Sequence, residues 1–478
     1  MKRYQFSVDA GLPGVWDERR WAMMKMTRLA ATAALLGFAM AAVLIGAASA
    51  ARAVTTSDKS AAILVWPKVV VDTSGRFGTC TIPDGLPCAS SANCAAGGIC
   101  NLEPTDTVIQ ITNNSTDRKQ AHCIYIDANS HCADNPGVVC QSSQDCPSGV
   151  GFSACIPGWS EIDFDVFLTP GQPIGWNAAS GKVAADFALH GPGTCTSRPG
   201  RQCFRDGDCP FGDTCNLGPS NVGSAVPPVP EDPFLGQLKC IEFDPQSNPS
   251  VPDRTATTNS LKGEGTIISV PAVAAAAPTA PVDAQKYNAV GLQATAGPGS
   301  APANQLQLGG NSGAEYAACP QTLILNHLFD GAVDPNGVPP HAGISTTVRT
   351  DLTLVPCGDN IASATPGHVT AQFLVFNEFE QRFSTSRTVD CFYESQLSRI
   401  DTPNPARSIF NANVAGTVGG QTRIRGVGSA ATGRGLIGVA RLFVNNDVTF
   451  VPSGAGYNLN QQGDPDFSVT QPDVITIP

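Results

Sequence analysis

The segment Ile162-Asp163-Phe164-Asp165-Val166-Phe167-Leu168-Thr169-Pro170-Gly171 indicates the fold class, because apolar side chains recur at every second position until the chain meets Pro-Gly. Such a period of two is typical of a strand with one face in a core and the other in solvent. Strand-like runs occur along the whole chain, at residues 62–71, 107–112, 123–126, 322–328, 347–355, 369–379, 388–393 and 436–444. The sequence therefore predicts an all-β protein.

The order of the first strands is typical of an immunoglobulin-like β-sandwich. An opening strand and a run that ends at Ile111-Thr112-Asn113-Asn114 are followed by a return strand and by the strand that stops at Pro170-Gly171. Residues 271–283 are rich in Pro and Ala, like a semi-rigid linker. We therefore expect one or two immunoglobulin-like sandwiches, over residues 54–270 and 284–450, with a turn-rich tail at 451–478. The alternative is that both halves complete one larger pair of sheets.

Residues 1–53 have the features of an export leader. Lys25 and Arg28 precede an uncharged stretch over residues 29–51, and the leader ends in the tripeptides Ala48-Ser49-Ala50 and Ala51-Arg52-Ala53. This order of features is typical of a signal peptide, with cleavage after one of the two tripeptides. The alternative is a retained anchor, because the uncharged stretch is long enough to cross the apolar layer of a bilayer.

The composition is acidic overall but low in charged residues. The chain carries 29 Lys and Arg against 40 Asp and Glu, a net charge of −11, and only 14% of its residues are charged. This balance argues against nucleic acid or an anionic membrane surface as a partner. The 48 glycines and 38 prolines favour turns and short strands over helices.

Seventeen cysteines indicate an oxidising compartment. Twelve of them form three modules of four with nearly the same spacing, at Cys80, Cys88, Cys94 and Cys100, at Cys132, Cys140, Cys146 and Cys155, and at Cys195, Cys203, Cys209 and Cys215. The modules (80–100, 132–155 and 195–215) hold few apolar side chains, so we expect two disulfides to stabilise each of them as an insert in a loop. Four cysteines allow three pairings, which stay open. Zinc sites prefer C-x2-C pairs, which the chain lacks.

Five further cysteines lie in or beside strand-like runs. We expect inter-strand disulfides between Cys123 and Cys240 and between Cys357 and Cys391. Cys319 would then be odd, and either buried and inert or bonded to another chain.

The mature chain also resembles a known family. The resemblance extends from Ile63-Leu64-Val65-Trp66-Pro67 through Phe373-Leu374-Val375 to the segment over residues 376–386, Phe-Asn-Glu-Phe-Glu-Gln-Arg-Phe-Ser-Thr-Ser. The family consists of uncharacterised exported proteins of Gram-negative bacteria, so the resemblance implies export and no named activity. The three modules are similar to the Dickkopf-type cysteine-rich inserts of bacterial surface proteins, which implies surface exposure and carries over no functional residue.

Two groups of carboxylates are candidate sites. Glu378 and Glu380 lie two residues apart on an expected strand, so both would share a face with Arg382, as an acid and a nucleophile of a glycosidase could. A solvated charged stripe is the favoured alternative, and we expect this strand to turn back at residues 384–386. Calcium takes oxygen ligands, which could come from Asp163 and Asp165, or in the third module from Asp206, Asp208 and Asp213. Turn formation and solubility are favoured over calcium binding.

Other motifs are weaker. The turn at residues 310–314, Gly-Asn-Ser-Gly-Ala, holds Ser312 without the strand-to-helix context of a nucleophilic serine. Gly426 and Gly428 lack the following helix of a dinucleotide site. The six histidines, His122, His131, His190, His327, His341 and His368, show no paired ligand spacing, so each is interpreted as an ordinary surface or core residue.

These features favour a non-enzymatic, disulfide-stabilised structural or adhesive protein that is secreted or lies at the cell surface, with the periplasm as an alternative location. Its expected partners are a surface glycan, another protein or a second copy of the chain, and a membrane only if the apolar leader is retained. No cofactor is expected, with calcium as the alternative. The alternative functions are a secreted hydrolase that acts on polysaccharide and a glycan-binding module.

Overall fold

The computed structural model describes residues 58–477 apart from 76–77, 82–83, 89–93, 95–99, 141–145, 149–150, 153, 158, 183–192, 204–208, 211, 217–224, 244–257, 271–282, 296–303, 310–314, 332–345, 429–432, 447–452 and 463–472. The chain divides into two compact units, Met1–Ala53 and Val54–Pro478, and every described residue belongs to the second. The expected leader at 1–53 therefore lies outside the described residues. No helix within the described ranges is long and apolar enough to cross a membrane.

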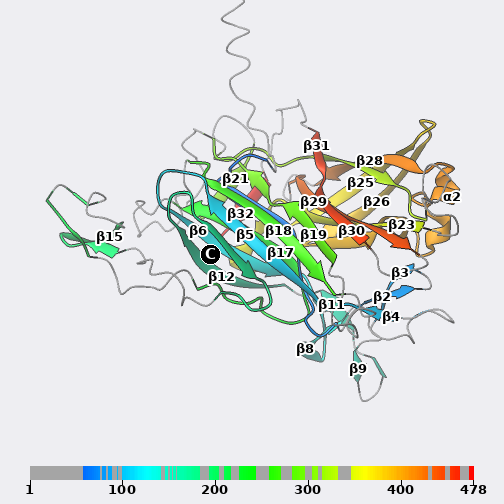
Figure 1. Ribbon diagram of the computed structural model, residues 1–478, viewed down its shortest axis with the longest axis horizontal. Helices are drawn as coiled ribbons and strands as arrows, with labels where there is room; N and C mark the ends of the chain where they lie inside the picture. The colour runs from blue at the N-terminus through cyan, green and yellow to red at the C-terminus, as the bar shows by residue number, and fades with distance from the viewer. Residues whose placement is uncertain are drawn as a thin grey trace, which may run out of the picture. The chain divides into compact units, whose positions relative to one another are not determined.

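Two antiparallel sheets, here called the first sheet pair, are built from β1 (Ile63–Val71), β5 (Thr105–Asn113), β6 (Lys119–Asp127), β12 (Ser160–Leu168), β13 (Pro173–Asn177), β17 (Phe234–Phe243), β18 (Leu261–Ser269), β19 (Asp283–Asn288) and β20 (Val290–Leu292). One sheet has the order β12-β6-β17-β1-β20, and the other has the order β13-β5-β18-β19. Figure 1 labels β6, β12 and β17 of the first and β5, β18 and β19 of the second. Side chains from both sheets form the first core, so the two sheets pack face to face.

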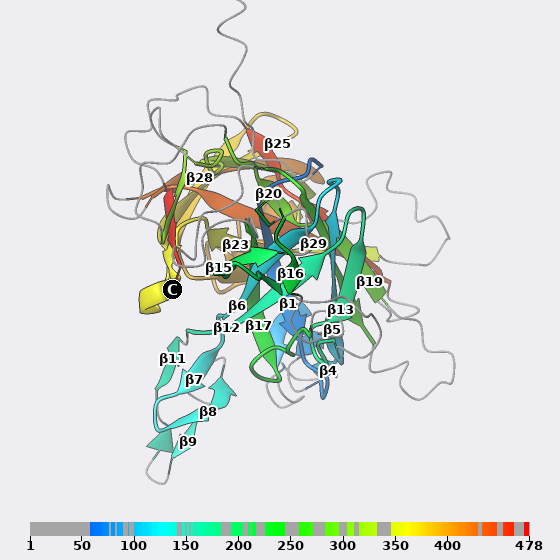
Figure 2. The same cartoon turned by 90° about the vertical axis from the view of Figure 1, so that its left-hand side faces the viewer.

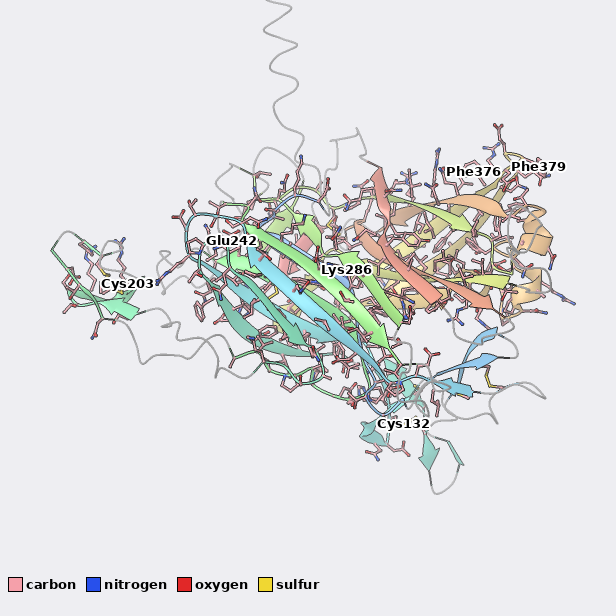
Figure 3. The ribbon with its side chains drawn as sticks, viewed as in Figure 1. Cys132, Cys203, Glu242, Lys286, Phe376 and Phe379 are labelled. Atoms are coloured by element: carbon pink, nitrogen blue, oxygen red, sulfur yellow. A yellow bond between two sulfur atoms is a disulfide. The ribbon has the colours of Figure 1, made fainter. Side chains whose placement is uncertain are left out.

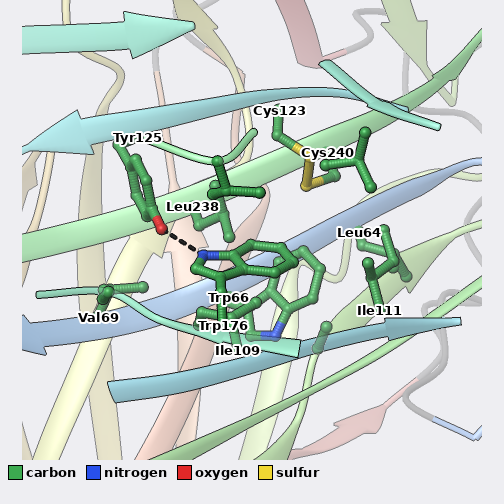
Figure 4. Packing of buried hydrophobic residues seen from close by; sticks show 14 of the residues in the cluster. Leu64, Trp66, Val69, Ile109, Ile111, Cys123, Tyr125, Trp176, Leu238 and Cys240 are labelled. Atoms are coloured by element: carbon green, nitrogen blue, oxygen red, sulfur yellow. Dashed lines mark hydrogen bonds between the residues drawn. A yellow bond between two sulfur atoms is a disulfide. The ribbon is translucent and has the colours of Figure 1, made fainter. Parts of the chain in front are cut away.

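The period-two segment behaves as its pattern predicts. It forms β12, which pairs with β6 without a register shift, and its Phe164, Val166 and Leu168 are buried in the first core. The same core holds Tyr125, whose hydroxyl accepts a hydrogen bond of 2.6 Å from Nε1 of Trp176 (Figure 4). A large aromatic group with a satisfied polar end can be buried at little cost.

The second sheet pair uses β22 (Thr322–Leu328), β23 (Thr346–Pro356), β25 (His368–Asn377), β26 (Arg382–Asp390), β27 (Tyr393–Gln396), β28 (Gly419–Val427), β29 (Leu436–Asn446), β30 (Ser453–Asn458) and β31 (Asn460–Gln462). Its sheets have the orders β26-β25-β28-β22-β31 and β27-β23-β29-β30, and they enclose the second core. The described helical turns are short: η5 (Ile361–Ser363), η6 (Leu397–Arg399), η7 (Pro405–Arg407) and α2 (Ala412–Ala415).

A third core, here called the linking core, joins the two sheet pairs. It combines Ile63 of β1 with Val355 of β23 and with Ile475 of a small sheet ordered β21-β32-β24, whose strands are Gln305–Leu308, Asp473–Thr476 and Asp359–Asn360. β19 and β20 lie beyond the Pro/Ala-rich stretch, and yet they pair with β18 and β1. The boundary expected at 271–283 therefore does not separate the sheets, and the expected turn-rich tail contributes β30, β31 and β32.

The cysteine modules form small sheets of their own. Their strands are β2 (Gly78–Thr81), β3 (Asp84–Cys88) and β4 (Cys100–Leu102); β7 (Ser130–Cys132), β8 (Asn135–Cys140), β9 (Pro147–Ser148), β10 (Gly151–Phe152) and β11 (Cys155–Pro157); and β14 (Gly193–Cys195), β15 (Arg198–Cys203) and β16 (Cys215–Asn216). They are inserted between β1 and β5, between β6 and β12, and between β13 and β17, and Figure 2 shows β7, β8, β9 and β11 grouped together. The prediction of an all-β protein with disulfide-rich loop inserts is confirmed, whereas the immunoglobulin-like topology stays a prediction.

Candidate functional site

Each cysteine module is closed by disulfides between its own cysteines. The first cysteine bonds to the third in all three modules, as Cys80–Cys94, Cys132–Cys146 and Cys195–Cys209. The third module adds Cys203–Cys215, and the fourth cysteines Cys100 and Cys155 are also disulfide-bonded. The side chains of Cys88 and Cys140 lie outside the described residues. Since the modules' small cores consist almost entirely of cysteine, sulfur contacts replace a conventional apolar core (Figure 3).

The remaining cysteines require one correction. The expected Cys123–Cys240 bond is present between directly opposed positions of β6 and β17. The expected bond between Cys357 and Cys391 is wrong, because Cys357 bonds to Cys319, and Cys391 is the free, buried thiol of the described chain. Cys391 lies between β26 and β27 and has a positive φ of 61°. It is therefore not part of the regular strand that the sequence predicted.

The expected pair of strand carboxylates is also absent. β25 ends at Asn377, whose side chain accepts hydrogen bonds from the backbone N–H groups of Phe379 (3.0 Å) and Gln381 (2.9 Å) and so closes a turn. Glu378 and Glu380 lie in this turn, and Glu380 has a positive φ of 61°. The two carboxylates therefore do not share a strand face. Residues 384–386, where the turn was expected, belong to β26 instead.

The aspartates considered for calcium have other roles. Asp165 lies 3.0 Å from Nδ1 of His122 across β12 and β6. Asp213 accepts hydrogen bonds from the backbone and hydroxyl of Ser197, which lowers its pKa and fixes a turn of the third module. Asp163 is exposed on the outer side of β12. Asp206, Asp208, Ser312, His190 and His341 lie outside the described residues. Gly426 lies in β28, where an added Cβ would be 1.9 Å from the backbone carbonyl oxygen of Arg434.

One face of the second sheet pair carries a pattern that sequence reasoning missed. On the outer side of the sheet β26-β25-β28-β22, Phe376 is opposite Arg382 and Gln421, and Arg423 and Arg425 follow on β28. The guanidinium carbon of Arg423 lies 5.3 Å from the ring centroid of Phe376. We call this surface, with Arg382, Phe376, Gln421, Arg423, Arg425 and Gln372, the arginine face.

The arginine face differs in charge from the rest of the protein. Along its four strands, the described outward positions between the turn at Glu378 and the far end at Asp390 hold arginine, phenylalanine, amide, hydroxyl and aliphatic side chains, including Leu374 and Ile324, and no carboxylate. Arg382, Arg423 and Arg425 are exposed, and Figure 3 shows Phe376 and Phe379 near one another. A cationic surface with an aromatic ring, on a chain of net charge −11, can attract a local anion.

A second cluster lies at the base of the second module, where β6 ends at Asp127 and β7 carries His131. Nε2 of His131 lies 2.8 Å from Oε2 of Glu231, which precedes β17. Asn129 holds one oxygen of each carboxylate, through its backbone N–H to Oδ1 of Asp127 (2.9 Å) and its side-chain Nδ2 to Oε1 of Glu231 (2.6 Å). The same amide nitrogen donates to the carbonyl of Pro233 at 2.7 Å.

The two carboxylates of this cluster share a hydrogen bond. Burial, followed by this bond to Glu231, raises the pKa of Asp127 well above its ordinary value. Although burial alone would raise the pKa of Glu231, hydrogen bonds from Asp127, His131 and Asn129 lower it. The shared hydrogen bond thus shifts the pKa values of the two carboxyl groups in opposite directions. The sequence carries only a weak signal for this cluster, because Glu231 is 100 positions from His131.

Comparison with known proteins adds no identity: no protein family model matches the chain, and no curated protein matches it.

Proposed function

We propose that the protein is a non-enzymatic, exported structural or adhesive protein, which binds an acidic polysaccharide at the cell surface or outside the cell through its arginine face. The observation that carries this proposal is the run of Arg382, Arg423 and Arg425 beside Phe376 on one exposed sheet face. The disulfides support the location, because such bonds persist in oxidising compartments.

The chemistry of the face favours a carboxylated sugar chain. A guanidinium group donates two parallel hydrogen bonds to a carboxylate, and it is less strongly hydrated than the ammonium group of lysine. The ring of Phe376 offers an apolar surface of the size of a sugar ring, and Gln372 and Gln421 add amide donors and acceptors. Nucleic acid fits less well, because the acidic remainder of the protein would repel a long phosphate backbone.

The modules and sheets support a scaffold rather than an enzyme. A glycosidase of the common type needs two carboxylates on opposite sides of a sugar bond, and Glu378 accepts a hydrogen bond from Gly419 N (2.7 Å) while Glu380 lies in the turn. We include in the proposal that both sheet pairs are immunoglobulin-like sandwiches. The support is that β17 separates β6 from β1 in the first sheet, and that each pair of sheets faces across one core.

Affinity electrophoresis of the purified exported protein through polygalacturonate, with neutral dextran in the parallel gel, tests the polysaccharide class. We expect polygalacturonate to retard the wild type and dextran to leave it unretarded. The Arg423→Ser/Arg425→Ser variant should bind at least about 100-fold more weakly, since two charge-assisted contacts of about 1.5–3 kcal/mol each are lost. Arg407→Ser removes an exposed arginine from η7 and serves as the matched control.

Retention of wild-type affinity by the double variant would contradict the proposal, as would equal retardation by dextran. Fractionation of the producing cells tests location separately: the proposal requires the mature protein in the medium or on the outer surface, and a cytoplasmic protein with reduced thiols would overturn it.

A further inference from the structure

The cluster at the base of the second module has the donor set of a metal site. Three ligand atoms, one each from Asp127, His131 and Glu231, lie within 4.8 Å of one another. Ligand atoms around a tetrahedral zinc ion, with bonds near 2.0–2.2 Å, are about 3.3–3.6 Å apart. The observed separations therefore need only small side-chain adjustments to surround one ion.

We propose that Asp127, His131 and Glu231 bind one divalent transition-metal ion of the zinc class and so fasten the second cysteine module to the loop before β17. One imidazole nitrogen and two carboxylate oxygens suit zinc, whereas calcium and magnesium prefer sites built of oxygen alone. Two carboxylates also balance the charge of a divalent ion.

The neighbouring groups orient the ligands before any ion binds. Asn129 donates hydrogen bonds to Oδ1 of Asp127 and to Oε1 of Glu231. The second oxygen of each carboxylate makes other contacts. Oε2 of Glu231 faces His131 at 2.8 Å, and Oδ2 of Asp127 lies 3.4 Å from the Ser160 hydroxyl. Because Asn129 is itself fixed by the carbonyl of Pro233, it supports the ligands as the outer-shell partners of metal sites commonly do.

The burial of the three ligands is uneven in a way that suits a metal site. Asp127 is 2% exposed, whereas the side chains of His131 and Glu231 are 20% and 24% exposed. An ion could therefore enter from the side of His131 and keep an open position for water, while Asp127 closes the inner side. His131 directly precedes Cys132, which bonds to Cys146, so the ion and the disulfide would restrain the module at adjacent residues.

The site is independent of the arginine face, so the two proposals can fail separately. The test is calorimetric titration of the full exported protein, freed of metal with a chelator, with zinc alone and with calcium alone, followed by cobalt as a spectroscopic probe. We expect one zinc ion per chain, no comparable calcium binding, and cobalt absorption of the kind given by nitrogen and oxygen ligands. Zinc should also raise the melting temperature.

Three variants locate the binding. His131→Gln and Glu231→Gln should each weaken zinc binding at least about tenfold, and Asn129→Ala should weaken it about 10–100-fold through the ligand orientation. His122→Gln is the matched control, because His122 also faces one carboxylate, Asp165 at 3.0 Å, and belongs to no group of three metal-ligating side chains in the described residues. It should bind zinc as the wild type does.

Two results would overturn the inference. If the wild type binds no zinc stoichiometrically, or binds calcium in its place, the cluster is a hydrogen-bonded contact between module and scaffold. If both glutamine variants keep wild-type affinity while folding normally by circular dichroism, zinc binds elsewhere.

Discussion

Lys239 of β17 and Asp359 of β24 form an ion pair that is almost completely buried, with side chains 0% and 1% exposed. This pair links the first sheet pair to the linking core, where an unpaired charge would have no water to solvate it. Burial raises the pKa of Asp359, and the attraction of Lys239 opposes that shift. The two charges therefore depend on one another.

Removing one member of the pair should be costly. Asp359→Asn leaves a buried ammonium group without its counter-charge, so we expect a loss of about 3–5 kcal/mol in the free energy of unfolding. The double variant Lys239→Met/Asp359→Leu, which removes both charges, should recover most of that loss. Guanidinium unfolding followed by fluorescence measures both, and an unchanged midpoint for Asp359→Asn would contradict the prediction.

The cysteine pairing predicts which thiol reacts. Cys391 should be alkylated in denaturant without a reductant, while Cys319 and Cys357 should stay protected until a reductant is added, as mass mapping of peptides would show. The Cys319→Ala/Cys357→Ala variant should lose about 4 kcal/mol of stability under the chain-entropy model, given the separation of 38 residues. Cys391→Ala should lose only about 1 kcal/mol. Alkylation of Cys319 before reduction would contradict the assigned pairing.

His327 should make the protein sensitive to acid. Burial lowers its pKa to about 4, and its Nε2 lies 2.8 Å from the Thr422 hydroxyl. An unfolded chain titrates this group near pH 6.5, so its contribution is complete above about pH 6.5 and is lost as the pH falls towards 4. The drop in stability between pH 7 and pH 4 should be about 3 kcal/mol smaller in His327→Gln.

The exposed His368 provides the control for that experiment. His368→Gln replaces a histidine whose side chain is 55% exposed and faces Asp390, and it is compared with the wild type over the same pH range. If His327→Gln lost as much stability between pH 7 and pH 4 as the wild type and His368→Gln, another group would account for the acid sensitivity.

Gly263 should not tolerate a side chain. A Cβ added to it would lie 2.2 Å from the ring of Trp66 in the first core, so Gly263→Ala should lose about 1–3 kcal/mol through overpacking. Gly175→Ala on β13 would place its Cβ no closer than 3.4 Å to a neighbour and should cost less. Thermal unfolding of the two variants gives the comparison, and equal melting temperatures would contradict the prediction.

Patterns that depend on nearby residues were read well from the sequence. The alternation in residues 162–168 follows from the geometry of a single strand, and the cysteine spacing follows from a repeated small module. The turn after Asn377 also had a local signal, because an asparagine side chain readily bonds to the backbone two residues on. The sequence nevertheless predicts the turn later, at residues 384–386, because Phe373, Val375, Phe379 and Phe383 are spaced as on one strand face.

Features that depend on chain topology could not be predicted in this way. The arginine face requires the register of β25, β26 and β28, which sets which side chains lie opposite one another. In the cluster of Asp127, His131 and Glu231, the first two residues precede the cysteines of the second module, and Glu231 follows those of the third. Cys319 and Cys357 are 38 residues apart and meet only in the folded chain. Both lie against Gly435, where an added Cβ would be 2.3 Å and 3.0 Å from their Cβ atoms.

The linking core also constrains the order in which the chain can fold. Ile63 and Val65 of β1 lie in this core together with Ile475 and Ile477. Ile475 is part of β32, and Ile477 follows that strand. Contacts between positions so distant in sequence form slowly, because the whole intervening chain must first be brought together. A chain emerging from a ribosome could therefore pair β1 with β17 and β20 well before its end appears, whereas the side of β1 that carries Ile63 and Val65 would stay incompletely covered until residues 475–477 had emerged.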